Sequence, residues 1–493
     1  MIRPESDPHV YPSPPSLLQR PTLSSLWVFV GPGVIIASVT IASGELVFAS
    51  RSGAIFGYGM LWCFLYAGIF KGIQVYTASR HIVLTGEHPM TTWCSMPVVG
   101  MAFPLLIVLP AVMLMLVGFS ALPEILATFI HRLMGGAVEG AGIGPWQHLE
   151  FWLNVWATVV LTACLILALI STYDIVERLS TVILGIMVLC IASAVVILGP
   201  NIPDLFQGLF LPRVSDYQPW VLEKYSQTFS GRSPWLEVLL YIGAVGGGSQ
   251  DYVGYIGFLR EKKWGLAGIR VAGSRELAEA ARNSASEVVE RARIWTRAPL
   301  LDTTLSFTFV ILVTLLFAIL GSMVLNPNRA IPDGSEFLTV QESFLTTLHP
   351  QLKWLYRVGV FLAFIGTLYG AFEVYSRVIS EGVRSIFPRF VERPFFKSLR
   401  TVTIIYCFLG GLLLVWLPKE IAGDVLGRVT FTGVISGGIA ACGLWCFAMI
   451  WADRYRLPPP LRMSWKLRLA TAVAGAVMFS LGVRVIVSYF QGN

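Results

Sequence analysis

The chain has 493 residues, of which 55% are apolar and 13% charged, and its mean hydropathy is +0.69. A soluble protein needs more polar residues than this to cover its surface, so the composition excludes a soluble class and indicates an integral membrane protein. The formal net charge is +7. Lys and Arg gather in alternate loops, as the positive-inside rule requires, so this charge does not indicate nucleic-acid binding.

Residues 1–25 are polar and rich in Pro, which predicts a disordered cytoplasmic tail. The rest of the chain, residues 26–493, is predicted to form one transmembrane domain. Its apolar runs have the length that a hydrocarbon core requires, and they are too long and too continuous for barrel strands. They predict an all-α protein with about eleven spans, at residues 27–49, 54–79, 98–118, 150–171, 178–199, 236–258, 301–325, 355–376, 401–417, 427–451 and 469–489. The distribution of basic loops places the N-terminus in the cytoplasm and the C-terminus outside a plasma (inner) membrane.

The first span carries an acid, Glu45, near its middle. A carboxylate at mid-span costs roughly 3 kcal/mol or more unless it faces protein, water or an ion. The small residues Ala42, Ser43 and Gly44 beside it weaken the helix. A helix broken at mid-membrane is a common way to build a substrate site in a secondary transporter. The alternative is a small-residue packing face whose Glu pairs with another helix.

Later spans carry further charged residues. Lys71 in the second span has two equal interpretations: it extends to the membrane surface or it pairs with a carboxylate. Glu124, near the outer end of the third span, is either a proton station or an interfacial charge. Glu373 and Arg377 are four residues apart in the eighth span, which favours an intrahelical salt bridge over an ion gate.

The sixth span contains a second break. Gly246, Gly247 and Gly248 are followed by Ser249, and each glycine costs a helix about 1 kcal/mol relative to Ala. Asp251 would then lie near the start of the following half-helix, where the dipole favours an acid and where it could also be an oxygen ligand. Breaks in spans one and six, five spans apart, indicate two inverted five-helix repeats plus one extra helix.

The long loop at residues 259–300 contains the stretch GSRELAEAARNSASEVVERARIW, which predicts a surface helix with Glu287 paired to Arg291. Its many basic residues suit the anionic inner leaflet of the lipid bilayer. The seven cysteines show no metal-finger spacing, and Cys442 and Cys446 are interpreted as packing residues. No nucleotide-binding or hydrolase motif occurs, so neither an enzyme nor a cofactor is expected.

Residues of the first, second and sixth predicted spans resemble those of a known family. The chain resembles the Nramp family of proton-coupled divalent-metal transporters, which have the LeuT-like fold. The matching residues are Gly31-Pro32-Gly33, Ile41, Gly44, Phe56-Gly57-Tyr58, Leu61-Trp62, Arg80, Thr85-Gly86 and Gly243-Ala244. The resemblance implies a secondary-active transporter that carries a divalent cation by alternating access.

The site residues of the family are altered in this chain. In register, the metal-binding Asp and Asn of the family's first helix correspond to Ala42 and Glu45, and the Pro of that helix corresponds to Ser43. The Met and His of the family's sixth helix correspond to Gly247 and Ser249. An acid of the family's third helix, three residues before Glu124, is Ala121. These losses argue against proton coupling.

The resemblance implies a set of oxygen ligands in this chain. They are Glu45, the carbonyls of Val39 and Ala244, and Gln250 or Asp251. Without a thioether, such a site suits Mg²⁺ or Mn²⁺ better than Fe²⁺.

Two alternatives remain open. In one, the scaffold transports a small organic substrate in the room that residues 246–249 leave. In the other, it is a membrane sensor that does not transport.

Overall fold

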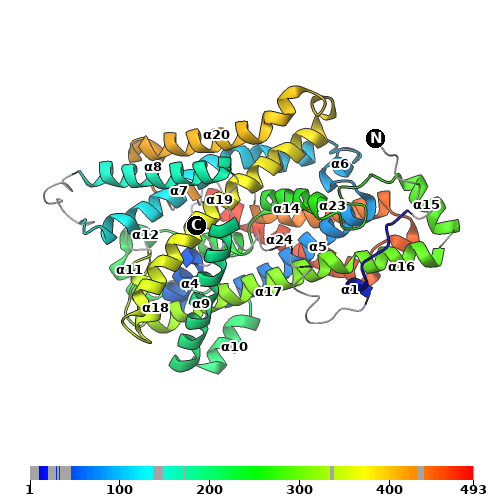
Figure 1. Ribbon diagram of the computed structural model, residues 1–493. Helices are drawn as coiled ribbons and strands as arrows, with labels where there is room; N and C mark the ends of the chain where they lie inside the picture. Colours follow the sequence, from blue (N-terminus) through cyan, green and yellow to red (C-terminus); the bar gives the residue numbers. More distant parts are fainter. Residues whose placement is uncertain are drawn as a thin grey trace.

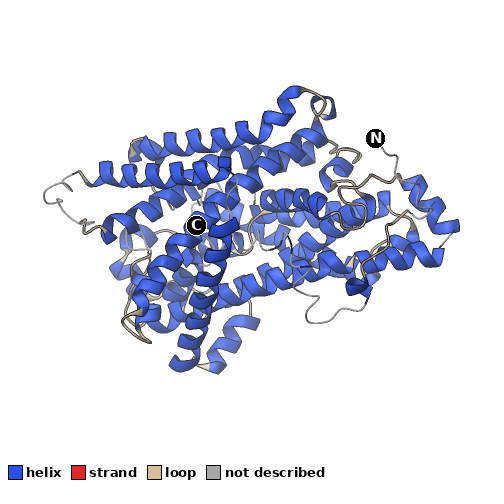
Figure 2. Ribbon diagram, in the orientation of Figure 1, coloured by secondary structure: helices blue, strands red, loops and turns tan. Residues whose placement is uncertain are grey.

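The computed structural model describes residues 10–19, 29, 31, 33, 46–136, 148–170, 174–283, 285–332, 338–425, 427–429 and 438–491. Within these ranges all regular structure is helical, as Figure 2 shows, which confirms the all-α prediction. Most of the predicted first span lies outside the described residues.

Six helical stretches among the described residues are long and apolar enough to cross a membrane: Ala102–Leu133, Leu149–Ile170, Glu287–Leu325, Leu352–Ile386, Pro394–Trp416 and Trp465–Gln491. Several of these helices expose large apolar side chains, such as Leu109 and Leu413, as lipid-facing helices do. The total of eleven spans stays a prediction.

The described ranges contain both short and long helices. In chain order they are α1 (Ser16–Gln19), α4 (Ser50–Phe56), α5 (Leu61–Thr85), α6 (Pro89–Trp93), α7 (Ala102–Leu133), α8 (Leu149–Ile170), α9 (Asp174–Leu198), α10 (Ile202–Phe210), α11 (Pro219–Lys224), α12 (Ser226–Phe229), α13 (Pro234–Ala244), α14 (Ser249–Lys262), α15 (Ser274–Asn283), α16 (Ala285–Trp295), α17 (Arg297–Leu320), α18 (Ser343–Thr346), α19 (Leu352–Ile386), α20 (Pro394–Trp416), α21 (Lys419–Ala422), α23 (Gly438–Arg456) and α24 (Trp465–Gln491). A π-helical turn, η3 (Gly321–Leu325), extends α17, and short 3₁₀ turns occur at Val340–Glu342, Pro388–Phe390 and Pro459–Leu461.

The long helices form two packed groups (Figure 1). Helices α7, α8, α19 and α20 pack against one another. In the view, α8 and α20 lie along the upper edge, and α19 runs from there toward the lower left. Helices α4, α5, α13 and α17 form the second group, with α23 and α24 packed side by side against α5. Helix α14 contacts both α19 and α5, so it lies between the groups. The broken sixth span therefore occupies the interface of the two groups.

Helix α4 crosses the end of α17 at very close range. A Cβ atom added to Gly53 would lie 1.9 Å from the carbonyl oxygen of Ala318, and one added to Gly321 would lie 2.3 Å from that of Ser50. The two backbones are therefore in direct contact at this crossing, with no side chain between them.

The N-terminal segment differs from the predicted disordered tail over residues 10–19. Tyr11 is fully buried, and its hydroxyl donates to the carbonyl of Leu84 at 2.9 Å. Arg291 and Trp295 of α16 donate to the carbonyls of Tyr11 and Pro12. The prediction is wrong for this part because one aromatic residue and free carbonyls give a Pro-rich segment enough contacts to pack.

The loop after α14 forms the predicted surface helix as two pieces, α15 and α16, at the right of Figure 1. Arg291 pairs with Glu287 at 2.8 Å, as the four-residue spacing predicts. The end of the helix bundle that carries these two helices is called the α15–α16 end below.

Candidate functional site

The predicted break in the sixth span is present: α13 ends at Ala244 and α14 begins at Ser249. Gly246 and Gly247 between them have φ angles of +65° and +81°, which L residues with side chains rarely adopt. A Cβ atom on Gly246 would also lie 2.7 Å from the ring of Phe307. The run of glycines thus forms the break, and Ser249 belongs to the second half-helix.

Asp251 lies in the first turn of α14, where the sequence predicts it. Its Oδ2 atom accepts a hydrogen bond from the backbone N–H of Gly248 at 2.8 Å. The free N–H groups and the positive dipole end of α14 stabilise a carboxylate at this position. The side chain is only 9% exposed, and it borders a cavity.

The cavity has a volume of about 270 Å³ and lies between α7, α13, α14, α19 and α23. Most of its wall is apolar. The polar or polarisable side chains in the wall are those of Lys71, Gln250, Asp251, Thr367, Tyr375 and Cys442. The cavity wall also contains Ala244, Gly247 and Gly248 at the break. Several of the site residues that the sequence predicts in the sixth span therefore border one cavity.

The predicted residues of the first span, Val39, Ala42, Ser43, Gly44 and Glu45, lie outside the described residues. Two residues that follow them, Val47 and Phe48, line the cavity. The described part of the chain therefore borders the cavity from the second residue after Glu45.

Lys71 reaches the break from α5 rather than the membrane surface. It is 1% exposed, and its ammonium group contacts backbone carbonyls between Ile242 and Gly247. Lys71 and Asp251 border the same cavity. The sequence shows a lysine in an apolar run, but it does not indicate that carbonyls are its partners.

Cys442 is in the cavity wall, although the sequence predicts a packing residue. The Ser249 hydroxyl donates to its sulfur at 3.3 Å, and Gln74 of α5 donates to the same hydroxyl at 3.4 Å. The thiol is 1% exposed, so it also packs.

Glu124 pairs with a residue that the sequence leaves without a role. Arg428 contacts its Oε2 atom at 2.6 Å and the Ser120 hydroxyl at 2.9 Å. Their neighbours Ala121 and Val429 line the cavity. The signal for Arg428 is visible in the sequence, since it is a lone basic residue at the start of a predicted span.

The predicted salt bridge between Glu373 and Arg377 is wrong. Glu373 pairs with Arg400 of α20, and Arg377 pairs with Glu261 of α14 at 2.6 Å. Both side chains instead connect α19 to neighbouring helices, because longer-range partners lie within their reach.

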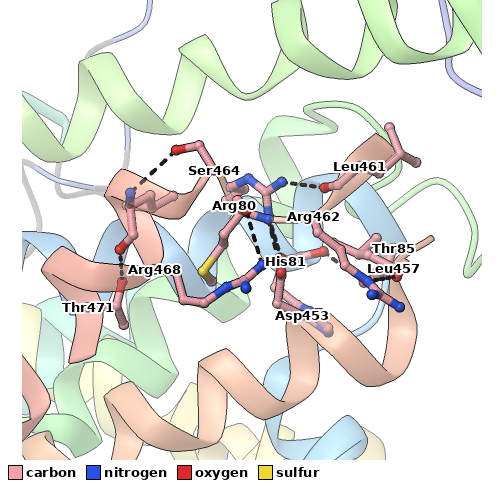
Figure 3. A network of polar contacts seen from close by, with 12 residues as sticks. Arg80, His81, Thr85, Asp453, Leu457, Leu461, Arg462, Ser464, Arg468 and Thr471 are labelled. Atoms are coloured by element: carbon pink, nitrogen blue, oxygen red, sulfur yellow. Dashed lines mark hydrogen bonds and ion pairs between the residues drawn. The ribbon is translucent and has the colours of Figure 1, made fainter. Parts of the chain in front are cut away.

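The α15–α16 end is joined by polar networks, one of which Figure 3 shows. Arg80 of α5 pairs with Asp453 of α23 at 2.8 Å, and Asp453 accepts from the backbone N–H of Met463 at 2.9 Å. Arg80 also donates to the carbonyl of Leu461. These contacts connect α5, α23 and the turn before α24.

A second network at this end centres on Asp302 of α17. It accepts from the backbone N–H groups of Gly31 at 2.7 Å and Gly33 at 3.1 Å. The Tyr255 hydroxyl of α14 donates to it at 2.7 Å. Asp302 therefore holds the start of the first span against α14 and α17.

A family model matches this chain over residues 33–247, and its description is "Nramp: Natural resistance-associated macrophage protein-like". The matched range includes the predicted break in the first span and ends within the break in the sixth span. Over this range, which is less than half of its length, the chain is similar to the Nramp family. An uncharacterized protein of Pasteurella multocida is 20% identical over 86% of both chains. Metal transporter Nramp3.1 of Populus trichocarpa and divalent metal cation transporter MntH of Mycobacterium leprae are 26% and 25% identical over 38% and 39% of this chain. These two matches span only 35% and 41% of the relatives.

Solved structures of transporters share the fold of this chain. A manganese transporter of Eremococcus coleocola, crystallised with an aromatic bis-isothiourea substituted compound, has a TM-score of 0.61 at 14% identity. The comparison covers 99% of this chain and 92% of that one. A closed nucleobase-cation-symport-1 transporter with bound bromovinylhydantoin has a TM-score of 0.51 at 14% identity, with 94% and 91% covered. These matches confirm the expected LeuT-like architecture.

Proposed function

We propose that the chain is a secondary-active transporter of a divalent metal cation, which crosses the membrane through the cavity by alternating access. The observation that carries this proposal is the position of Asp251 and Gln250 beside the cavity at a broken helix. Broken half-helices that meet at mid-membrane are typical substrate sites of secondary transporters. Similarity to a transporter family also argues against an enzyme.

The ligand chemistry supports a hard cation. Within the described residues, no three side chains of His, Cys, Asp or Glu come together. Asp251 would therefore share the ion with amide and carbonyl oxygens, such as those of Gln250 and Ala244, and with Glu45 and the carbonyl of Val39. Mg²⁺ and Mn²⁺ accept such ligands and retain water, so we propose them ahead of Fe²⁺. The sulfur of Cys442, which is buried, already accepts a hydrogen bond from the Ser249 hydroxyl.

Proton movement is not part of this proposal. Residue 121, which is three residues before Glu124, is Ala and lines the cavity. The family's His is replaced by Ser249, whose hydroxyl does not titrate near neutral pH. We therefore expect metal uptake without coupled proton uptake.

The test is uptake of Mn²⁺ and Mg²⁺ into proteoliposomes that contain a pH dye. We expect uptake of at least one metal, its loss in Glu45→Ala and Asp251→Asn, and no change in internal pH. Glu150→Ala is the matched control, because Glu150 is exposed and pairs with Lys419 far from the cavity. Absence of both fluxes from folded protein would contradict the proposal.

The apolar cavity wall favours a second candidate, a small organic substrate. A volume of about 270 Å³ can hold a molecule of amino-acid size. Competition of uptake by amino acids and not by metals would support this candidate over the first.

A further inference from the structure

The ammonium group of Lys71 is surrounded by carbonyl oxygens of the broken helix. Its Nζ atom lies 2.6 Å from the oxygen of Gly247, 2.7 Å from that of Ile242, 2.8 Å from that of Val245 and 3.1 Å from that of Gly243. An ammonium group has three N–H donors, so four such contacts exceed an ordinary set of hydrogen bonds. The arrangement is that of a small cation in a shell of oxygens.

The shell follows from the way α13 ends. The last turn of a helix leaves its carbonyls without N–H partners and carries the negative end of the dipole. Ile242 and Gly243 belong to that turn. The positive φ angles of Gly246 and Gly247 turn the chain so that the carbonyls of Val245 and Gly247 reach the same point.

We propose that Lys71 is a tethered cation, whose ammonium group occupies a monovalent-cation site formed by the break in the sixth span. Unwound carbonyls of broken helices are positions where secondary transporters hold free cations. In this chain the cation is covalently attached to α5, so the break needs no free Na⁺ or K⁺ to hold its carbonyls together. This inference concerns the break itself and does not depend on which substrate is transported.

A simpler role for Lys71 is to balance the charge of Asp251, which borders the same cavity. The two roles make different predictions for Lys71→Arg. Charge balance survives this change, because Arg is also a cation. A site sized for an ammonium group does not accept the planar guanidinium, so the tethered-cation role predicts a lower melting temperature for Lys71→Arg in every salt.

The decisive experiment measures the melting temperature of the purified full chain in choline, sodium, potassium, ammonium and methylammonium chloride at equal concentration. We expect the wild type to melt at one temperature in all five salts. Lys71→Ala should melt several degrees lower in choline and regain most of the loss with the best-fitting small cation, which binds only the folded state. If Lys71→Ala cannot be purified in choline, the folded yield in each salt gives the same comparison.

Gln74→Leu is the matched control. Gln74 is buried on the same helix, one turn from Lys71, and contacts Ser249 rather than the carbonyl shell. Its loss should lower the melting temperature equally in all salts. The inference fails if Lys71→Ala is as stable as the wild type, if no small cation restores it, or if Lys71→Arg matches the wild type. None of these outcomes depends on metal uptake, so this inference and the proposed function can fail separately.

Discussion

Arg428 lies with its Nη2 atom 2.6 Å from Oε2 of Glu124, and this pair joins α7 to the segment at residues 427–429. Ala121 and Val429, next to the two partners, line the cavity. The exposed fractions of the two side chains are 8% for Arg428 and 19% for Glu124, so the pair is shielded from water. It therefore holds α7 and residues 427–429 together beside the cavity wall.

Removal of one charge of this pair should destabilise the protein. In Glu124→Ala the guanidinium of Arg428 loses its acid and keeps the hydrogen bond to the Ser120 hydroxyl, so we expect a loss of about 1–3 kcal/mol. The exchange of charges in Glu124→Arg with Arg428→Glu should restore part of the melting temperature. A double-mutant cycle checks this coupling, and additive effects of the single variants would show that the pair contributes nothing.

A larger effect is expected at the ion pair of Arg51 and Glu237, which joins α4 to α13. Both side chains are fully buried, 3.4 Å apart, and Arg232 also pairs with Glu237. Glu237→Ala leaves buried positive charge without its acid, so we expect a loss of about 3–5 kcal/mol, measured by thermal unfolding. Glu279→Ala, in an exposed pair with Arg275, is the control and should not change the melting temperature measurably. Equal effects of the two variants would refute this distinction.

The Asp302 network predicts local opening at the start of the first span. Asp302→Asn replaces one acceptor oxygen by an NH₂ group, so one of the donors from Gly31, Gly33 or Tyr255 loses its partner. Hydrogen exchange at residues 29–33 should become faster, while exchange in α8, which is remote from Asp302, should not change. Tyr255→Phe should have a smaller effect of about 1 kcal/mol on stability. Unchanged exchange in Asp302→Asn would contradict this role.

His88, in the turn after α5, predicts acid sensitivity. Burial is the main cause that lowers the pKa of His88 to about 4 from its usual 6.5. Its Nδ1 atom accepts from the N–H of Met90 at 3.2 Å, which requires a neutral ring. The unfolded state therefore binds more protons, and stability falls as the pH drops from 6.5 toward 4.

His88→Asn keeps an acceptor at the helix start but does not titrate. The variant should lose less of its melting temperature than the wild type between pH 6.5 and 4.5. If the two proteins lose the same amount, the titration of His88 is not the cause of the acid sensitivity.

The break in the sixth span could be predicted from the sequence because three consecutive glycines destabilise any helix locally. Asp251 was equally predictable, since the dipole at the start of a helix favours an acid. Both conclusions depend on neighbours in the chain. The partners of Glu373, Arg377 and Glu124 depend on which helices pack together, and local spacing contains no such information.

Lys71 illustrates the same limit. Its burial in an apolar run requires some partner, and the sequence identifies carboxylates and the membrane surface as the two obvious ones. Backbone carbonyls are invisible in a side-chain pattern, because every residue has one. Only the geometry of the break brings four of them together around Nζ.

The contact between α4 and the end of α17 has an evolutionary consequence. Even the smallest side chain at Gly53 or Gly321 would collide with main-chain atoms, so no series of small substitutions can adjust the distance between these two backbones. Outside the glycines of the break, the side chains of the cavity wall are free of this restriction. In descendants of this chain, exchange of side chains in the cavity wall can therefore change the shape and polarity of the cavity, while the crossing itself is inherited unchanged or lost with the fold.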